Sequence, residues 1–226
     1  MSMMKTIKSI VRHMTNRRFL SFVFRYFGHN RFRGLKGNIV SFEDSILSHC
    51  SILFHGSGNV VRFGGGNRLV NCKIDVYGND CMINIGSNGY FCNDNFRLED
   101  DRTKILVGDN VKMCGAVHMG IVEGTTLTIG NGCLFSSDIS ITTTDSHSIL
   151  NLETGQRINP SADVIIGNHV WVGQKAIICK GVRLVDDIVV GRCALVTKSV
   201  TQSHVAIAGI PAKVVREGIT WDHKRI

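Results

Sequence analysis

His147 is the side chain in this sequence best suited to moving a proton near neutral pH. It is the only imidazole in the polar stretch Thr142–Asp163, which reads TTTDSHSILNLETGQRINPSAD. Because an imidazole titrates at about pH 6.5, it can take a proton from a hydroxyl and release it again within one reaction cycle. A loop histidine alone is weak evidence of catalysis. The regular sequence around this stretch makes a catalytic base the favoured interpretation.

The sequence after this stretch repeats with a period of six. From Ile166 to Thr201 it reads IGNHVW VGQKAI ICKGVR LVDDIV VGRCAL VTKSVT. The first position of every block is aliphatic, the fifth is apolar or small, and an outward sixth position separates them, which is the alternation of a β-strand. Triplets rich in Gly, Asn, Asp and Lys separate these strands and predict bends.

Three such bends close one coil of 18 residues, so the repeat predicts an all-β fold, a solenoid of parallel strands with an aliphatic interior. An amphipathic helix fits poorly, because a six-residue period advances about 240° per block and scatters the aliphatic side chains. Trp171 is the outward sixth residue of its block. Because one coil is 18 residues long, Trp171 is expected to stack under Val189, and Ile177 under Leu195. These exposed apolar columns favour packing between subunits.

Preceding residues follow the repeat less clearly. Residues 38–87 contain short β-like runs between Gly and Asn turns and predict degenerate coils, whereas the polar residues 92–104 predict a loop that bulges from the solenoid. Regular spacing resumes at Ile105 and reaches Ile141. The next inward residue is due four positions later, but the pattern restarts at Val164, so about 19 residues are inserted there. Long insertions in compact folds are usually functional.

We therefore divide the chain into a basic amphipathic arm (1–36), a parallel β-helix domain (37–209) with the inserted loop 142–163, and a C-terminal extension (210–226). Pro211 is expected to end the last coil, and a short basic tail with Trp221 follows.

Positive charge is concentrated in the arm, where residues 1–36 hold nine Lys or Arg and no acidic residue, although the whole chain carries a net charge of +8. Apolar residues at helical spacing predict a helix over residues 1 to about 33. It either lies on an anionic membrane surface or caps the first coil and packs on a neighbouring subunit. Basic residues interrupt the apolar run, which excludes a signal peptide, and the run is too short to span a membrane. No nucleic-acid-binding motif accompanies the charge, so no nucleic-acid partner is expected.

The eight cysteines are scattered, with no CxxC pair and no histidine at a zinc-binding distance. This pattern favours reduced thiols in a cytoplasmic protein and predicts no metal site.

The hexads resemble those of the left-handed β-helix, or hexapeptide-repeat, acyltransferases, whose members usually form trimers. The left hand comes from this resemblance, since most parallel crossovers are right-handed. The histidine loop, together with the motif NHVWxG at Asn168–Gly173, resembles more narrowly the bacterial capsular polysaccharide and polysialic acid O-acetyltransferases. This resemblance covers roughly residues 125–222. Ser148 departs from the Pro that often follows the histidine in sugar acetyltransferases of this fold, which leaves the acceptor open.

The resemblance implies direct transfer of acetyl from acetyl-CoA to a sugar hydroxyl, with His147 as general base. Trp171 is implied to lie beside the reacting groups, where its indole N–H can stabilise the oxyanion. The alternative interpretation is that Trp171 makes a contact between subunits of the trimer. A homotrimer with active sites between neighbours and a glycan acceptor is implied as well. The residues expected to bind acetyl-CoA are Gly173, Lys175, Ala176, Lys180, Ala194, Lys198, Pro211, Lys213 and Arg216. Those expected to bind the acceptor are Asp145, Arg157, Asn159 and His169. Asp145 is a poor partner for the imidazole, because two residues along an extended chain point it away.

Three alternatives stay open. The first is N-acetylation of a nucleotide-linked amino sugar. The second is a metal-dependent hydratase, which needs three imidazoles at a spacing that His49, His55, His118 and His169 do not show. The third is a scaffold without catalysis. The expected location is the cytoplasm, with the arm as a candidate peripheral contact to the inner membrane.

Overall fold

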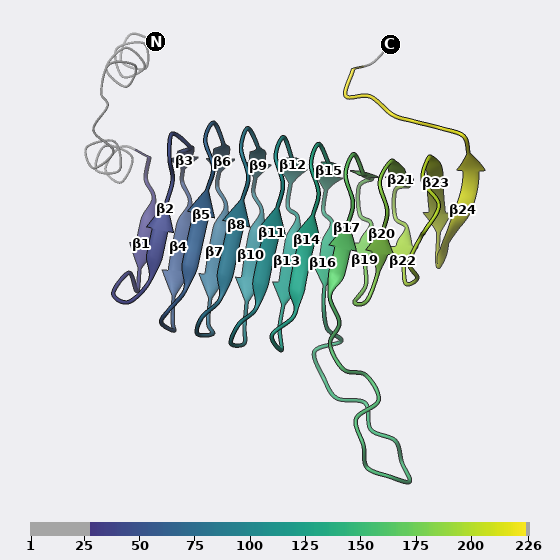
Figure 1. Cartoon of the computed structure of the whole chain (residues 1–226), viewed down its shortest axis with the longest axis horizontal. Helices are drawn as coiled ribbons and strands as arrows, with labels where there is room; N and C mark the ends of the chain where they lie inside the picture. Colours follow the sequence, from purple (N-terminus) through teal and green to yellow (C-terminus); the bar gives the residue numbers. More distant parts are fainter. Residues whose placement is uncertain (1–27, 225–226) are drawn as a thin grey trace.

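The computed structural model describes residues 28–224, which wind into a parallel β-solenoid. Strands three apart in sequence pair with each other, so each coil adds one strand to each of three sheets (Figure 1). The parallel β-helix predicted from the hexads is confirmed. Most of the predicted N-terminal helix lies outside the described residues, and at its expected end Arg31–Arg33 forms strand β1 instead.

Each sheet runs the length of the solenoid. The first sheet contains, in order, β1 (Arg31–Arg33), β4 (Ser51–Phe54), β7 (Lys73–Val76), β10 (Asn95–Leu98), β13 (His118–Ile121), β16 (Ser140–Thr142), β19 (Ile177–Ile178) and β22 (Leu195–Val196). The second contains β2 (Ile39–Ser41), β5 (Val60–Phe63), β8 (Met82–Ile85), β11 (Lys104–Val107), β14 (Thr126–Ile129), β17 (Val164–Ile166) and β20 (Arg183–Leu184). The third contains β3 (Ile46–Ser48), β6 (Arg68–Val70), β9 (Tyr90–Cys92), β12 (Lys112–Gly115), β15 (Leu134–Ser137), β18 (Trp171–Val172), β21 (Ile188–Val190), β23 (Val205–Gly209) and β24 (Ala212–Glu217).

Coil length changes along the chain. Before the inserted loop, most paired residues lie 22 positions apart, as in Val60 with Met82 and Met82 with Lys104, and the others lie 20 to 23 apart. After the loop they lie 18 positions apart, as in Ile177 with Leu195. The prediction of degenerate coils in residues 38–87 is therefore wrong. These coils are regular, but their longer period hides them from a search for six-residue blocks.

The bulge predicted at residues 92–104 is also wrong, because β10 pairs in register with β7 and β13. Most polar residues of this segment, at positions 93–94 and 99–103, lie at the corners of the coil, and Asn95 and Arg97 lie in β10. Asp94 is buried, and its carboxylate accepts the backbone N–H groups of Cys92 and Val117, each at 2.9 Å. Corner side chains of this kind satisfy backbone donors that the bends leave unpaired.

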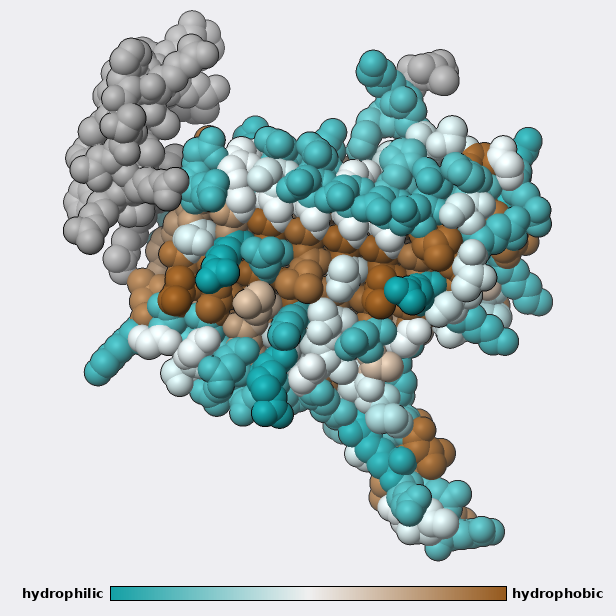
Figure 2. Space-filling view, in the orientation of Figure 1, coloured by the Kyte–Doolittle hydropathy of each residue, from teal (hydrophilic) through white to brown (hydrophobic). Residues whose placement is uncertain are grey.

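The interior is apolar throughout, and its side chains match the coil length. Before the loop the fully buried residues include Phe63, Phe91, Phe96 and Phe135, each at most 1% exposed. After the loop, the core is built from aliphatic residues and alanines. Longer coils enclose more volume and need aromatic rings to fill it, because protein interiors are close-packed. Outside, apolar surface forms a band along the solenoid (Figure 2).

The last parallel strand, β23, ends at Gly209, and the C-terminal extension after it stays on the solenoid. Strand β24 folds back on β23 as an antiparallel neighbour, with Ile210 and Pro211 in the turn between them. After β24, the chain returns across the upper edge of the solenoid (Figure 1). This return brings Trp221 onto His169, just before β18.

Candidate active site

The inserted loop projects from the corner between the first and second sheets, where it joins β16 to β17 (Figure 1). Its two ends are adjacent, since the Ala162 N–H donates to the Thr143 carbonyl at 3.0 Å. Further out, Leu150 and Arg157 form an antiparallel bridge, so the tip resembles a hairpin. Apolar side chains at the tip are exposed: Ile149 by 54%, Leu150 by 57%, Leu152 by 100% and Ile158 by 61%.

Asn159 holds the loop around His147. Its side chain is 7% exposed, and its Oδ1 accepts the Ile149 N–H at 2.6 Å. Its Nδ2 donates to the His147 carbonyl at 2.8 Å and to Asp145 Oδ2 at 3.0 Å. One amide thus fixes the backbone at and after the histidine and the Asp145 carboxylate before it. In the structure it supports the loop, whereas the sequence assigned it to the acceptor.

Lys180 ties the same segment to the next coil. Its Nζ lies 2.6 Å from Asp145 Oδ2 and donates to the carbonyls of Asn159 and Pro160 at 2.9 and 3.0 Å. Hydrogen bonds from Lys180 and then Asn159 lower the pKa of Asp145. The ammonium of Lys180, predicted to bind acetyl-CoA, is engaged by this loop. Asp145 likewise faces Lys180 and not the imidazole.

The imidazole of His147 is exposed, and within residues 28–224 no protein group hydrogen-bonds to its ring. The histidine is held by its main chain, because its N–H donates to the Asp145 carbonyl at 2.8 Å and its carbonyl accepts from Asn159. Both ring nitrogens are therefore open to a substrate or to a neighbouring chain.

Arg157 connects the loop to the preceding coil. Its Nη1 donates to Glu123 Oε1 at 2.8 Å, and this bond is the main cause of the lowered pKa of Glu123. A hollow of about 340 Å³ opens beside this contact. It is lined by Arg97, Glu99, Asp100, His118, Gly120, Val122, Glu123, Thr142, Thr144 and Ser146. Burial, followed by the charge of Arg97, lowers the pKa of His118. Ser146, which lines the hollow, directly precedes the proposed base His147 in the chain.

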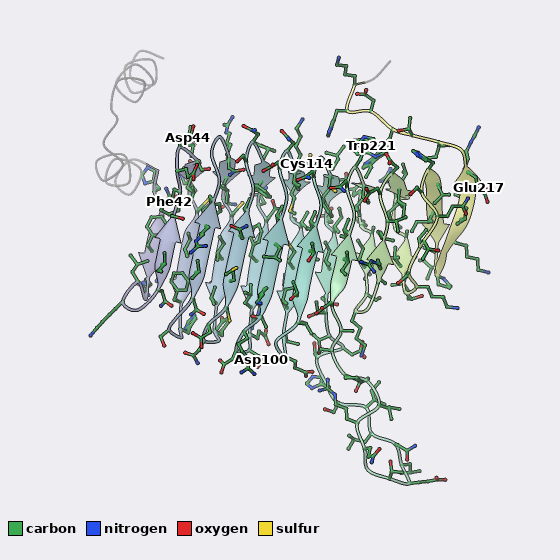
Figure 3. All side chains as sticks on the ribbon, viewed as in Figure 1. Phe42, Asp44, Asp100, Cys114, Glu217 and Trp221 are labelled. Atoms are coloured by element: carbon green, nitrogen blue, oxygen red, sulfur yellow. The ribbon has the colours of Figure 1, made fainter. Side chains whose placement is uncertain are left out.

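Trp171 lies on the third sheet and points outward, 39% exposed between the buried Val170 and Val172, as predicted. It pairs in register with Val189, also as predicted. Its ring lies near Trp221, which is labelled at the upper edge of the solenoid in Figure 3, whereas the loop projects from the lower edge. The structure therefore does not bring His147 and Trp171 together within one chain.

His169, predicted to bind the acceptor, lies beside this tryptophan pair. Its Nδ1 is 2.7 Å from Asp187 Oδ1, and its ring stacks on Trp221 with centroids 4.4 Å apart. Sequence analysis missed Asp187, although its position one 18-residue coil after His169 places it directly alongside. It also missed the roles of Glu123 and Trp221, for which the repeat carries no signal.

Apart from Lys180, the residues predicted to bind acetyl-CoA fall into two groups, one buried and one exposed. The side chains of Ala176 and Ala194 are in the core, 0% and 1% exposed, so only their main chain can face a ligand. Gly173 is required by packing, since a Cβ there would lie 2.8 Å from the Val190 carbonyl oxygen. The exposed members are Lys175, Lys198, Pro211, Lys213 and Arg216.

Known proteins resemble this chain over most of its length. A polysialic acid O-acetyltransferase of Neisseria meningitidis is 32% identical over 189 residues, which cover 75% of this chain and 88% of the relative. The chain belongs to the hexapeptide-repeat acetyltransferases. WbbJ of Escherichia coli K12, provisionally assigned as an O-acetyl transferase of lipopolysaccharide biosynthesis, is 30% identical over 81% of this chain and 90% of its own length. No family model matches the sequence.

Solved structures of this acetyltransferase family share the fold. The polysialic acid O-acetyltransferase OatWY superposes with a TM-score of 0.70 at 29% identity, over 88% of this chain and 90% of its own. NeuO, a polySia-specific acetyltransferase, gives a TM-score of 0.75 at 23% identity, over 86% of this chain and 81% of its own, which shows the fold alone. The predicted left-handed β-helix and the acetyltransferase class are confirmed.

Two further findings concern residues 28–224 of this acetyltransferase. They contain no group of three His, Cys, Asp or Glu side chains placed to share a metal ion. They also contain no helix long and apolar enough to cross a bilayer.

Proposed function

We propose that this acetyltransferase transfers acetyl from acetyl-CoA to a hydroxyl of a bacterial surface polysaccharide. Its relatives that act on polysialic acid and in lipopolysaccharide biosynthesis support this choice. The observation that carries the proposal is the loop around His147, whose main chain is fixed by Asn159 while both ring nitrogens stay open.

In the proposed reaction, neutral His147 takes the proton of the sugar hydroxyl as its oxygen attacks the thioester carbonyl carbon. The C–S bond then breaks, the acetyl group stays on the sugar oxygen as an ester, and the thiolate of CoA takes the proton back from the imidazolium. No other reactant is needed. Trp171, at the site, would donate its indole N–H to the oxyanion that forms during attack.

We further propose a homotrimer whose active sites lie between neighbouring chains. His147 and Trp171 lie at opposite edges of one chain, so a site that uses both takes them from two chains. The apolar side chains at the loop tip are exposed, Leu152 most of all, and their burial against a neighbouring chain would be favourable. Acetyl-CoA would then follow the interface, with its phosphates near Lys175, Lys198, Lys213 and Arg216.

The acceptor would occupy the hollow that Ser146 and His118 line. Its only Lys or Arg is Arg97, which is already paired with Glu99, and Asp100 and Glu123 add negative charge. This lining gives an anionic sugar little to bind. We therefore expect neutral glycans to serve at least as well as sialic acid polymers.

The test is release of free thiol from acetyl-CoA with a panel of neutral and sialylated bacterial glycans, for the wild type, His147→Ala and His118→Ala. The proposal expects glycan-dependent release that His147→Ala abolishes and that His118→Ala, which changes only the lining of the hollow, lowers without abolishing. The product should lose its acetyl group in mild alkali, as an ester does. Release only with nucleotide-linked amino sugars, giving an alkali-stable amide, would instead establish the N-acetyltransferase alternative.

We also propose a cytoplasmic location with the basic arm on the inner membrane. The support is the excess of Lys and Arg in residues 1–36. Co-sedimentation with anionic liposomes should be stronger for the full chain than for residues 28–226, which keep β1 intact. Equal sedimentation of the two forms would exclude the membrane role.

A further inference from the structure

Trp221 is the buried residue of the C-terminal tail. It is 8% exposed, although it follows the last strand and lies outside the main core. The tail is attached just before it by the Ile219 N–H, which donates to the His204 carbonyl at 3.0 Å. A tail residue buried to this degree has a specific contact surface on the solenoid.

That surface is the turn that leads into β18. The indole N–H of Trp221 donates to the His169 carbonyl at 2.9 Å, and the indole stacks on the His169 imidazole at 4.4 Å with 10° between the planes. The imidazole is also fixed by Asp187, whose Oδ1 lies 2.7 Å from the ring Nδ1. Trp221 therefore contacts both the main chain and the side chain of His169.

The same indole reaches Trp171, two residues further on. The two ring centroids are 6.0 Å apart with a 45° tilt, a favourable aromatic geometry. In-register neighbours Leu134 and Val189 flank Trp171 along the sheet but are aliphatic, and its ring stays 39% exposed. Of the aromatic contacts found within residues 28–224, the one with Trp221 is the only one that Trp171 makes.

We propose that Trp221 is a positioning residue that holds Trp171 in its working orientation for acyl transfer. This inference rests on the proposed function, because it concerns the residue that would face the reacting groups. Trp221 does not contact the substrates in this role. It pins the turn at His169 through one hydrogen bond and restricts the Trp171 ring through one aromatic face.

The sequence offers a direct readout, since the chain contains two tryptophans and removal of Trp221 leaves Trp171 as the sole tryptophan, which can be excited selectively over tyrosine. Trp221→Ala removes the hydrogen bond and the ring, whereas Trp221→Phe removes the hydrogen bond and keeps an aromatic face. Emission wavelength and acrylamide quenching of Trp171 then report its environment, and thiol release reports kcat and KM. The mirror variant Trp171→Phe supplies the emission of Trp221 alone.

For Trp221→Ala we expect kcat to fall roughly tenfold or more with little change in KM for acetyl-CoA, since a small misplacement of a reacting group is costly. The Trp171 emission should shift to the red and become easier to quench. Trp221→Phe should lie between Trp221→Ala and the wild type in both measurements. Should Trp221→Ala fail to fold, Trp221→Phe decides alone, with a partial loss of kcat expected.

Unchanged kcat, or unchanged emission and quenching of Trp171, in folded variants would overturn the inference. A fall in thermal stability with kcat intact would mean that Trp221 only anchors the tail. The fluorescence measurement needs no turnover, so the two proposals fail separately. Absence of thiol release from the wild type refutes the acetyltransfer proposal and with it the catalytic role, while an active wild type with an equally active Trp221→Ala refutes positioning alone.

Discussion

Hydrogen bonds from Asn159, and not a hydrophobic core, order the loop segment that carries His147. The Asn159 amide makes three hydrogen bonds that span both sides of His147, and each such bond contributes about 1 kcal/mol. We expect Asn159→Ala to lower the rate of thiol release roughly tenfold or more, because misplacing a catalytic group by about 1 Å can cost a hundredfold. The melting temperature should change by less than about 4 °C, since the loop lies outside the solenoid core.

Asn151 provides the matched control. It lies in the same loop, where its Oδ1 accepts the N–H groups of Glu153 and Thr154 at the tip. Asn151→Ala should therefore disturb the tip and spare the segment around His147. Equal losses of rate in the two variants would show that Asn159 has no specific part in placing the base.

Asp94 makes stability depend on pH. Burial raises its pKa from the ordinary value of 3.8 to about 7, despite the two backbone N–H groups that it accepts. The folded state thus holds this proton more tightly than the unfolded state. The protonated Asp94 carboxyl adds at most about 4 kcal/mol to the free energy of unfolding. This contribution is fully present below about pH 4 and is lost as the pH rises through 7. The pKa values of the nearby thiols Cys72 and Cys114 are raised, so both stay protonated in that window.

The measurement is urea unfolding at several pH values between 4.5 and 8. The wild type should lose free energy of unfolding across this range, and Asp94→Asn should show a flatter profile. Parallel profiles for the two proteins would mean that Asp94 is ionised throughout.

The loop is an element that the solenoid does not need. Thr143 and Ala162 are joined by a hydrogen bond at its base, and β14 and β17 pair in register across it. Deletion of residues 144–162 joins Thr143 to Asp163 and leaves a coil of the 18-residue length seen further on. We expect the shortened protein to fold, with a melting temperature within about 4 °C of the wild type. It should release no thiol.

Circular dichroism and differential scanning calorimetry check the fold of this variant, and the thiol assay checks activity. Residual glycan-dependent release would place the base outside the loop, with His118 or His169 as the candidates. Failure to fold would show that the loop closes the coil as well as carrying chemistry.

Sequence reasoning succeeded where side chains follow the six-residue period. The hexads predicted the sheets after the loop, the outward Trp171 and the place of the insertion, because each inward residue is fixed by the closed coil. It failed for residues 38–104, where the longer coils hide the six-residue period and residues such as Asp94 occupy corners, although the inward spacing predicted from Ile105 to Ile141 is confirmed. Within the loop, hydrogen bonds from Asn159 and Lys180 join residues at no fixed spacing. The pairing of Trp221 with His169 depends on the path of the tail, which no repeat encodes.

On the scale of the whole molecule, a shared site can be tested by mixing subunits. His147→Ala and Trp171→Ala chains, co-expressed, form interfaces in which one chain supplies an intact histidine and its neighbour an intact tryptophan. With random mixing in trimers, about three-quarters of the assemblies contain both chains and each has one intact site, so about one quarter of the wild-type rate should return.

Each variant expressed alone is the control and should be inactive, and light scattering should give the mass of a trimer for every protein. Activity that stays at the level of the single variants, in mixed assemblies that have been verified, would place both residues at one site within a single chain. A monomer or dimer by light scattering would contradict the trimer directly.

The coils before β10 line neither the hollow nor the inserted loop. Each coil pairs only with its neighbours, so whole coils can be gained or lost before the loop without altering the spacing of β16, β17 and β18. Every added coil lengthens the molecule by about 4.8 Å, the distance between paired strands. The number of coils at the N-terminal end can therefore change the length of the molecule while β16, β17 and β18 keep their spacing.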